Sequence, residues 1–127
     1  MNSEEHQEQC AVMKWWSMSC KRFGIGENML FAIPNGGKRD AITGKILKDE
    51  GVRAGIPDLF LAVPRMNGDP KHGLFIEMKK RKGGRVSQAQ KEMIANLNDE
   101  GYAAVVCQGF QQAVLAIEMY LKGAMRI

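Results

Sequence analysis

The segment PDLFLAVPRMNGDPKHGLFIEMK, residues 57–79, contains two apolar runs that each carry an acidic residue. Asp58 opens the first run, and Glu77 lies near the end of the second, two positions before Lys79. Side chains alternate between the two faces of a strand, so Glu77 and Lys79 share a face while Met78 points into the other layer. If the two runs pair as a hairpin, Asp58 lies near Glu77. Two carboxylates and an ammonium group then converge at one place.

Such a cluster suits a hard divalent cation. Mg²⁺ binds oxygen ligands and keeps several waters, which leaves room for a phosphate substrate. A lysine beside it can orient or deprotonate the attacking water, or stabilise charge on the phosphate. A structural salt-bridge network is the alternative interpretation of the same residues. An acid at the end of an apolar run favours the metal site, because an unpaired buried charge is costly. We therefore predict that Asp58 and Glu77 hold Mg²⁺ or Mn²⁺.

The composition is that of an ordinary globular domain. The chain has 127 residues, of which 45% are hydrophobic and 25% charged, and this length fits a single domain over residues 1–127. The three cysteines form no CxxC motif, which favours a reduced compartment. No apolar run approaches the roughly 20 residues of a membrane helix, and the polar, acidic first residues are unlike a signal peptide. We expect a cytoplasmic protein.

Periodicity and turn residues predict an α/β fold. The expected elements are a helix at about 4–20, strands at 29–33, 58–63 and 74–79, a helix at 87–99 with Ser87 as N-cap, a strand at 103–107 and a helix at 110–121. Four residues of the first helix recur at helical spacing and share one face, namely Glu5, Gln9, Val12 and Trp16. A turn is expected at 34–37, and the glycine-punctuated stretch 38–56 predicts a long ordered loop or a small hairpin. The order helix, three strands, helix, strand, helix predicts a central mixed β-sheet flanked by helices.

Basic residues gather in two stretches of this chain of net charge +4. The first stretch contains Lys38, Arg39, Lys45, Lys48 and Arg53. The second contains Lys79, Lys80, Arg81, Lys82, Arg85 and Lys91, with no acid among them. Basic loops beside a metal site would contact a phosphate backbone, although a solubilising surface has a similar composition. We expect DNA contacts from Lys38, Arg39, Lys45, Arg53, Lys80, Arg81, Lys82 and Arg85.

Motifs along nearly the whole chain resemble the PD-(D/E)xK restriction-endonuclease-like superfamily, and within it the VRR-NUC (virus-type replication-repair nuclease) domain. The similar motifs are Glu5-His6-x-x-Gln9, Ile33-Pro34-Asn35-Gly36-Gly37, Gly51-Val52-Arg53-Ala54-Gly55-Ile56-Pro57-Asp58-Leu59, Ile76-Glu77-Met78-Lys79 and Ser87-x-x-Gln90. The resemblance implies a restriction-endonuclease-like core, in which the mixed sheet carries the active site.

The resemblance also implies a role for each motif residue. The implied metal ligands are Asp58, Glu77, the backbone carbonyl of Met78 and, directly or through water, Glu5. Lys79 is the implied catalytic lysine, and Gln90 is the glutamine that supports the active site. Glu5 and Gln9 lie one helical turn apart, so both can face the same pocket. The alternative for Glu5 is a solvated position on the helix face.

The implied function is a structure-selective DNA endonuclease that acts on branched DNA such as four-way (Holliday) junctions. Stand-alone domains that resemble this chain are typical of phages and prophages. Resolving a junction needs two symmetric nicks, so we expect a homodimer. Its candidate interface is apolar surface on the first helix (Met13, Trp15 or Trp16) or the last (Met119, Tyr120). The alternatives are a non-catalytic nucleic-acid-binding module and a flap-type or nonspecific nuclease. We expect neither a membrane partner nor a small-molecule cofactor.

Overall fold

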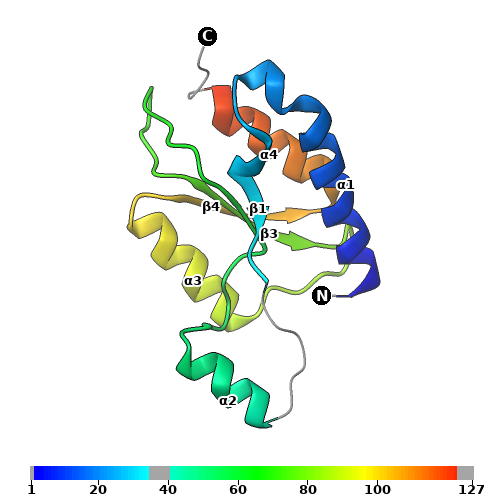
Figure 1. The fold of residues 1–127 in the computed structure, drawn as a ribbon, viewed down its shortest axis with the longest axis vertical. Helices are drawn as coiled ribbons and strands as arrows, with labels where there is room; N and C mark the ends of the chain where they lie inside the picture. The colour runs from blue at the N-terminus through cyan, green and yellow to red at the C-terminus, as the bar shows by residue number, and fades with distance from the viewer. Residues whose placement is uncertain (1, 35–40, 123–127) are drawn as a thin grey trace.

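A computed structural model of the chain describes residues 2–34 and 41–122, which form one sheet with helices on both faces (Figure 1). The helices are α1 (Ser3–Ser19), α2 (Ala41–Asp49), α3 (Gln88–Asp99) and α4 (Phe110–Lys122). The strands are β1 (Leu30–Ala32), β2 (Leu59–Leu61), β3 (Leu74–Lys79) and β4 (Ala103–Gln108). Two short 3-10 helices, η1 (Cys20–Phe23) and η2 (Glu27–Met29), connect α1 to β1. Within the described residues, no helix has the length and apolarity to cross a membrane.

The sheet has the strand order β1-β2-β3-β4. β2 is antiparallel to both β1 and β3, whereas β3 and β4 are parallel. The β2–β3 pair is the predicted hairpin, with Phe60 opposite Phe75. Parallel neighbours need a crossover connection, and α3 provides it between β3 and β4. The predicted mixed sheet flanked by helices is therefore confirmed.

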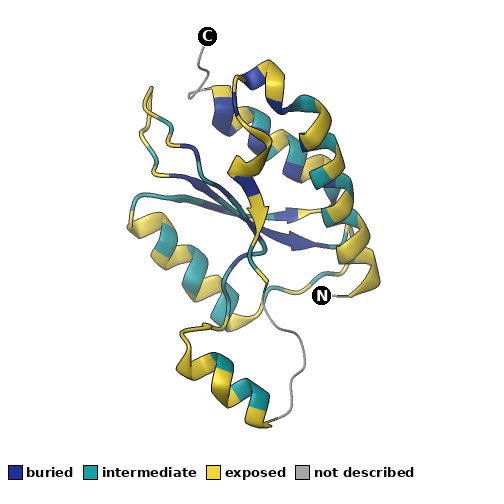
Figure 2. Ribbon diagram, in the orientation of Figure 1, coloured by how far each residue is buried: buried dark blue, intermediate teal, exposed yellow. Residues whose placement is uncertain are grey.

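The main core lies between the sheet and the α1–α4 layer (Figure 2). Alternate residues of β2 and β3 point into it and are fully buried, namely Leu59, Leu61, Ile76 and Met78. Val12 and Trp16 of α1 are also fully buried, which confirms the predicted inner face of the first helix. Trp16 Nε1 donates to the Glu27 carbonyl at 2.8 Å, and the Tyr120 hydroxyl donates to the Val63 carbonyl at 2.7 Å. Both aromatic residues thus belong to the core, and the prediction that either lies in a dimer interface is wrong.

The opposite face of the sheet carries α3 and a group of aromatic side chains. The rings of Phe60 and Phe75 stack with their centroids 4.3 Å apart, and Tyr102 packs edge-on against Phe75. Glu77 and Lys79 follow Phe75 on this same face, where α3 approaches the end of β3. Glu77 and Lys79 therefore lie on the same face of the sheet as the aromatic side chains, next to the last of them.

The segment 38–56 differs from the predicted loop or hairpin, because residues 41–49 form the helix α2. This helix lies beyond α3 and apart from the sheet in Figure 1. Positions 35–40, which include most of the predicted turn as well as Lys38 and Arg39, lie outside the described residues.

The pairs that stabilise α2 are spaced four positions apart. Lys45 Nζ lies 2.7 Å from the Asp49 carboxylate, and Ile42 and Ile46 occupy equivalent positions one turn apart. Gly44 within the helix costs only about 1 kcal/mol relative to alanine. The glycines of this segment favoured a loop in the sequence-based prediction, but one isolated glycine does not stop a helix.

Candidate active site

The two predicted acids meet at the point where the pairing of β2 and β3 ends. Leu59 pairs with Ile76, so Asp58 lies beside Glu77 across the two strands. The Asp58 Oδ2 atom accepts a hydrogen bond from the backbone N–H of Met78 at 2.7 Å. The N–H and C=O of one strand residue point towards the same neighbouring strand, so the Met78 carbonyl faces the side on which Asp58 lies. The structure thus brings three of the predicted ligands together.

Glu77 and Lys79 are charged side chains in a buried place, 3% and 7% exposed. Lys79 Nζ lies 3.5 Å from Glu77 Oε2, and Gln90 Nε2 donates to the same oxygen at 3.2 Å. The other oxygen, Glu77 Oε1, is buried and has no hydrogen-bond partner among the described residues. Leaving a buried polar atom unpaired costs about 1–3 kcal/mol. Oε1 is therefore the atom at which a further ligand would be stabilised.

The negative charge of Glu77 is disfavoured by its surroundings. Burial, and then repulsion from Asp58, raises the pKa of Glu77 from 4.5 to about 8, although Lys79 acts in the opposite direction. Both causes disfavour the ionised carboxylate. A bound divalent cation would reverse this preference, because its charge is the largest in such a site. Perturbed carboxylates of this kind gather at functional sites.

Gln90 uses different atoms of its side chain for two partners. It lies in the first turn of α3, where Ser87 is the N-cap that the sequence predicts. Gln90 N donates to Ser87 Oγ at 3.1 Å, and Ser87 N donates to Gln90 Oε1 at 2.9 Å, which forms a capping box. The remaining Nε2 donates to Glu77. The helix cap therefore orients the amide that contacts the Glu77 carboxylate.

Gln90→Glu is expected to preserve the helix and damage the site. Glutamate completes a capping box as well as glutamine does, so the cap is kept. The amide nitrogen that donates to Glu77, however, is replaced by an oxygen of a third carboxylate. We expect cleavage to fall about 10- to 100-fold with an unchanged circular dichroism spectrum. Gln111→Glu on the exposed side of α4 introduces the same charge change and is the matched control. Equal cleavage by both variants would contradict this role.

Gly55 sets how closely the loop before Asp58 approaches α3. Its φ is +82°, and a Cβ atom would lie 2.4 Å from the Ala89 carbonyl oxygen and 3.0 Å from the Gln90 nitrogen. These neighbours are backbone atoms of the capped first turn, so a side chain at position 55 would have to displace the helix. The close contact therefore fixes the spacing between the loop that carries Asp58 and the helix that carries Gln90.

Gly55→Ala is expected to reduce cleavage about 100-fold, the effect of misplacing a catalytic group by about 1 Å. Gly51→Ala is the matched control, because Gly51 also has a positive φ, +104°, yet its added Cβ meets nothing within 4 Å. Both substitutions strain the backbone by about 1–2 kcal/mol. Cleavage rates and urea unfolding of the two proteins measure the difference. Similar losses in both would show that the contact with α3 is unimportant.

Glu5 is not part of the acidic pair. It is half-buried in the first turn of α1, and its Oε2 accepts a hydrogen bond from Asn2 Nδ2 at 3.2 Å. In the part of the chain that the structure describes, no three acidic, histidine or cysteine side chains are grouped to bind a metal. The role of Glu5 in a metal shell, directly or through water, therefore stays a prediction.

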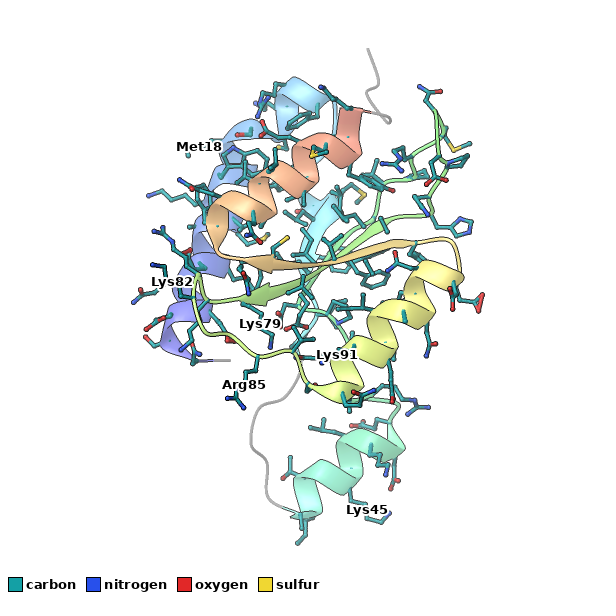
Figure 3. The ribbon with its side chains drawn as sticks, turned by 180° about the vertical axis from the view of Figure 1, so that it is seen from behind. Met18, Lys45, Lys79, Lys82, Arg85 and Lys91 are labelled. Carbon is teal, nitrogen blue, oxygen red and sulfur yellow. The ribbon has the colours of Figure 1, made fainter. Side chains whose placement is uncertain are left out.

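The predicted DNA contacts are distributed over two places. Lys82, Arg85 and Lys91 lie along the segment from the end of β3 to the start of α3, near Lys79, whereas Lys45 lies on α2 (Figure 3). The exposed members of the predicted set are Lys45, Arg53, Arg81, Lys82 and Arg85, and Lys80 is half-buried. The connection after β3 thus carries most of the predicted cations that the structure describes.

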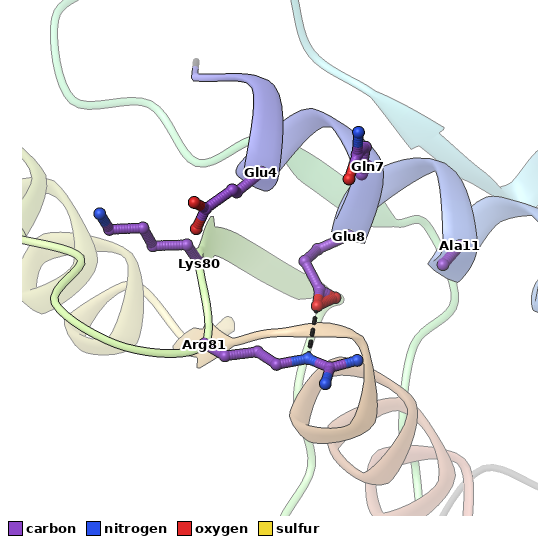
Figure 4. A pocket seen from close by; sticks show the side chains of 6 residues that line it. All are labelled: Glu4, Gln7, Glu8, Ala11, Lys80 and Arg81. Carbon is purple, nitrogen blue, oxygen red and sulfur yellow. Dashed lines mark hydrogen bonds and ion pairs between the residues drawn. The ribbon is translucent and has the colours of Figure 1, made fainter.

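Glu8 is the acid of α1 that the sequence analysis missed. Its Oε1 accepts a hydrogen bond from Arg81 Nε at 2.7 Å (Figure 4), and its Oε2 accepts one from the backbone N–H of Phe110 at 3.0 Å. These contacts tie α1 to the loop after β3 and to the start of α4. The partners lie 73 and 102 positions away along the chain. Nothing in the local sequence distinguishes Glu8 from Glu4 and Glu5.

A family model matches residues 1–111, and that family is the VRR-NUC domain. The chain belongs to the VRR-NUC family. A solved structure named "VRR_NUC domain protein" resembles this VRR-NUC domain with a TM-score of 0.77 and 31% sequence identity, covering 97% of this chain and 92% of the other. The search of curated proteins gave no match. The predicted family is thus confirmed, and the chain contains a nuclease-type domain.

Proposed function

We propose that this VRR-NUC domain is a Mg²⁺- or Mn²⁺-dependent endonuclease that hydrolyses phosphodiester bonds in branched DNA. The observation that supports it most is the pair formed by the half-buried Asp58 and the buried Glu77, with Lys79 Nζ 3.5 Å from the Glu77 carboxylate. A module that only binds nucleic acid gains nothing from two carboxylates beside a phosphate, since like charges repel. The family supports the nuclease class, and the intact acidic pair supports catalysis.

The oxygen donors of the site fit a hard divalent cation. Asp58, Glu77 and the Met78 carbonyl would hold it, and such oxygens suit Mg²⁺ or Mn²⁺. The buried Glu77 Oε1, which has no hydrogen-bond partner within the described residues, is a ready ligand atom. When bound, the cation supplies Lewis acidity to the phosphate and lowers the pKa of a bound water.

The protein's own groups have separate tasks in this proposal. Lys79 lies on the face of Glu77 and positions the attacking water, whose proton it helps to remove. Gln90 holds Glu77 Oε2, which leaves Oε1 for ligation. The cations after β3 contact backbone phosphates, and such contacts give affinity without reading the base sequence. Selectivity then depends on the shape of the DNA.

Cleavage of labelled duplex, flap and four-way-junction DNA tests this function. Purified protein is incubated with each DNA in Mg²⁺, Mn²⁺ or EDTA. We expect the four-way junction to be cut fastest with either metal, and no DNA to be cut in EDTA. Undiminished cleavage in EDTA would contradict the metal dependence. Faster cleavage of flaps than of junctions would show that the flap, and not the junction, is the preferred substrate.

We further propose a homodimer formed through the outer surfaces of α1 and α4. Met18 of α1 and Leu115 and Met119 of α4 are large apolar side chains with 74%, 56% and 63% exposure. Exposed apolar surface on neighbouring elements marks candidate interaction sites, and α1 and α4 pack side by side. Of the predicted interface residues, Met119 is therefore the best placed. Two-fold pairing would supply the second active site that two symmetric nicks require.

Leu115→Glu combined with Met119→Glu is expected to convert the dimer into a monomer, because two charges would be buried unpaired. Light scattering should give twice the chain mass for the wild type and the single mass for the variant. Ile42→Glu with Ile46→Glu on α2 is the control, since these residues are similarly exposed, at 75% and 53%, far from α4. A wild-type protein that is monomeric at micromolar concentration would refute the dimer.

A further inference from the structure

A hollow of about 350 Å³ lies between α1 and the segment that follows β3 (Figure 4). Its lining residues are Glu4, Gln7, Glu8, Ala11, Lys80 and Arg81. Lys80 and Arg81 directly follow Lys79 in the chain. The hollow therefore adjoins the end of β3, the strand that carries Glu77 and Lys79.

Arg81 is held at both ends although most of its side chain is exposed. A Cβ atom on Gly109 would lie 2.7 Å from Arg81 Cγ, so the aliphatic stem packs directly against the glycine backbone. At the other end, Nε donates to Glu8 at 2.7 Å. A guanidinium group has five N–H donors in a rigid fork, and the bond to Glu8 uses one of them. The terminal nitrogens lie beyond that bond (Figure 4).

Glu8 orients Arg81 without cancelling its charge. The Glu8 side chain is only 13% exposed, and its second oxygen accepts the backbone N–H of Phe110 at the start of α4. The N-terminus of a helix carries a partial positive charge that favours a carboxylate. The negative charge of Glu8 is thus shared between the helix and Arg81. The guanidinium consequently keeps a net attraction for a further anion.

We propose that the hollow is a subsite for a DNA backbone phosphate next to the scissile one, bound by an Arg81 that Glu8 holds in position. This inference rests on the proposed nuclease function. The two terminal nitrogens of a fixed guanidinium match two oxygens of a phosphate. Fixing the fork in advance reduces the side-chain entropy that binding would otherwise remove.

Two acids on the same helix separate this proposal from simple electrostatics. Glu4 and Glu8 both line the hollow, but Glu4 is exposed whereas Glu8 contacts Arg81. Removing a negative charge near DNA should strengthen binding if only the overall field matters. Glu8→Gln should instead weaken binding, because an amide offers one acceptor oxygen for the two donors and no charge to hold the Arg81 guanidinium. The two substitutions are therefore expected to change DNA affinity in opposite directions.

The test is fluorescence anisotropy with a labelled four-way-junction DNA in EDTA, at a temperature at which every variant is folded. We expect Glu4→Gln to bind as tightly as the wild type or more tightly, and Glu8→Gln to bind about 3- to 10-fold more weakly. Arg81→Gln should bind about 10-fold more weakly, with a salt dependence reduced by about one phosphate contact. In a protein that already carries Arg81→Gln, the substitution Glu8→Gln should not weaken DNA binding further.

The double substitution distinguishes positioning from helix capping. Loss of the contact with Phe110 lowers the thermal midpoint whether or not Arg81 is present, whereas the DNA effect should require Arg81. Glu8→Gln that binds as tightly as Glu4→Gln, or that weakens binding equally without Arg81, would overturn the subsite. A wild-type protein that binds no DNA would instead contradict the proposed nuclease function itself.

Discussion

Asp58→Asn is expected to abolish cleavage and leave the protein folded. Asparagine keeps an oxygen that can accept the Met78 N–H, which Asp58 accepts at 2.7 Å, so the local backbone contact survives. The negative charge that would ligate the cation is lost. A metal ion contributes several kcal/mol of transition-state stabilisation, so cleavage should fall about 1,000-fold or more. Undiminished cleavage by the Asp58→Asn protein would contradict the site.

The same substitution should change how the metal-free protein responds to pH. The pKa of Glu77 is about 8 in the folded protein and 4.5 in an unperturbed chain. Between these values the folded protein binds more protons than the unfolded chain, so its stability falls as the pH rises from about 4.5 to about 8. Over this range the free energy of unfolding falls by at most about 5 kcal/mol. In Asp58→Asn the repulsion is removed while the burial remains, so the fall should be smaller. Urea unfolding in EDTA at pH 5 and pH 8 measures it, and an equal fall in both proteins would contradict the coupling of the two acids.

Lys79→Met is expected to separate cation binding from turnover. Lys79 is 7% exposed and contacts Glu77, but it offers no ligand atom to a cation. Removing its charge should therefore preserve or strengthen binding of Mn²⁺. Loss of a group that transfers or positions a proton reduces the rate about 100- to 10,000-fold.

The control for this prediction is Lys14→Met, which removes the same charge from an exposed position on α1. It should cleave DNA as the wild type does. Isothermal calorimetry with Mn²⁺ and single-turnover cleavage measure the two properties of each protein. Loss of Mn²⁺ binding by Lys79→Met together with near-normal cleavage would exclude its catalytic role.

The acidic pair was predictable because it depends on local patterns. Alternation along two short runs places Glu77 and Lys79 on one face, and a hairpin between the runs brings Asp58 beside them. Ser87 three positions before Gln90 is a capping-box signature. Each of these features is determined by neighbours in sequence, and the structure shows all of them.

Features that depend on distant contacts were not predictable. Glu8 acquires its role from Arg81 and Phe110, and only the packing of α1 against the end of β3 brings them together. Trp16 and Tyr120 were predicted as interface residues because their helices carry large residues on several faces. Their hydrogen bonds to backbone carbonyls inside the core decide otherwise. The helix α2 was missed because a glycine within it was interpreted as a turn residue.

Anomalous diffraction from crystals soaked in Mn²⁺ tests the central claim most directly, because it locates the cation without reference to activity. We predict one strong peak about 2.1 Å from carboxylate oxygens of Asp58 and Glu77, with the Met78 carbonyl as a further ligand. The Asp58→Asn protein, soaked in the same way, should lack this peak. A wild-type crystal with no peak between the two carboxylates, at a concentration of Mn²⁺ that supports cleavage, would contradict it.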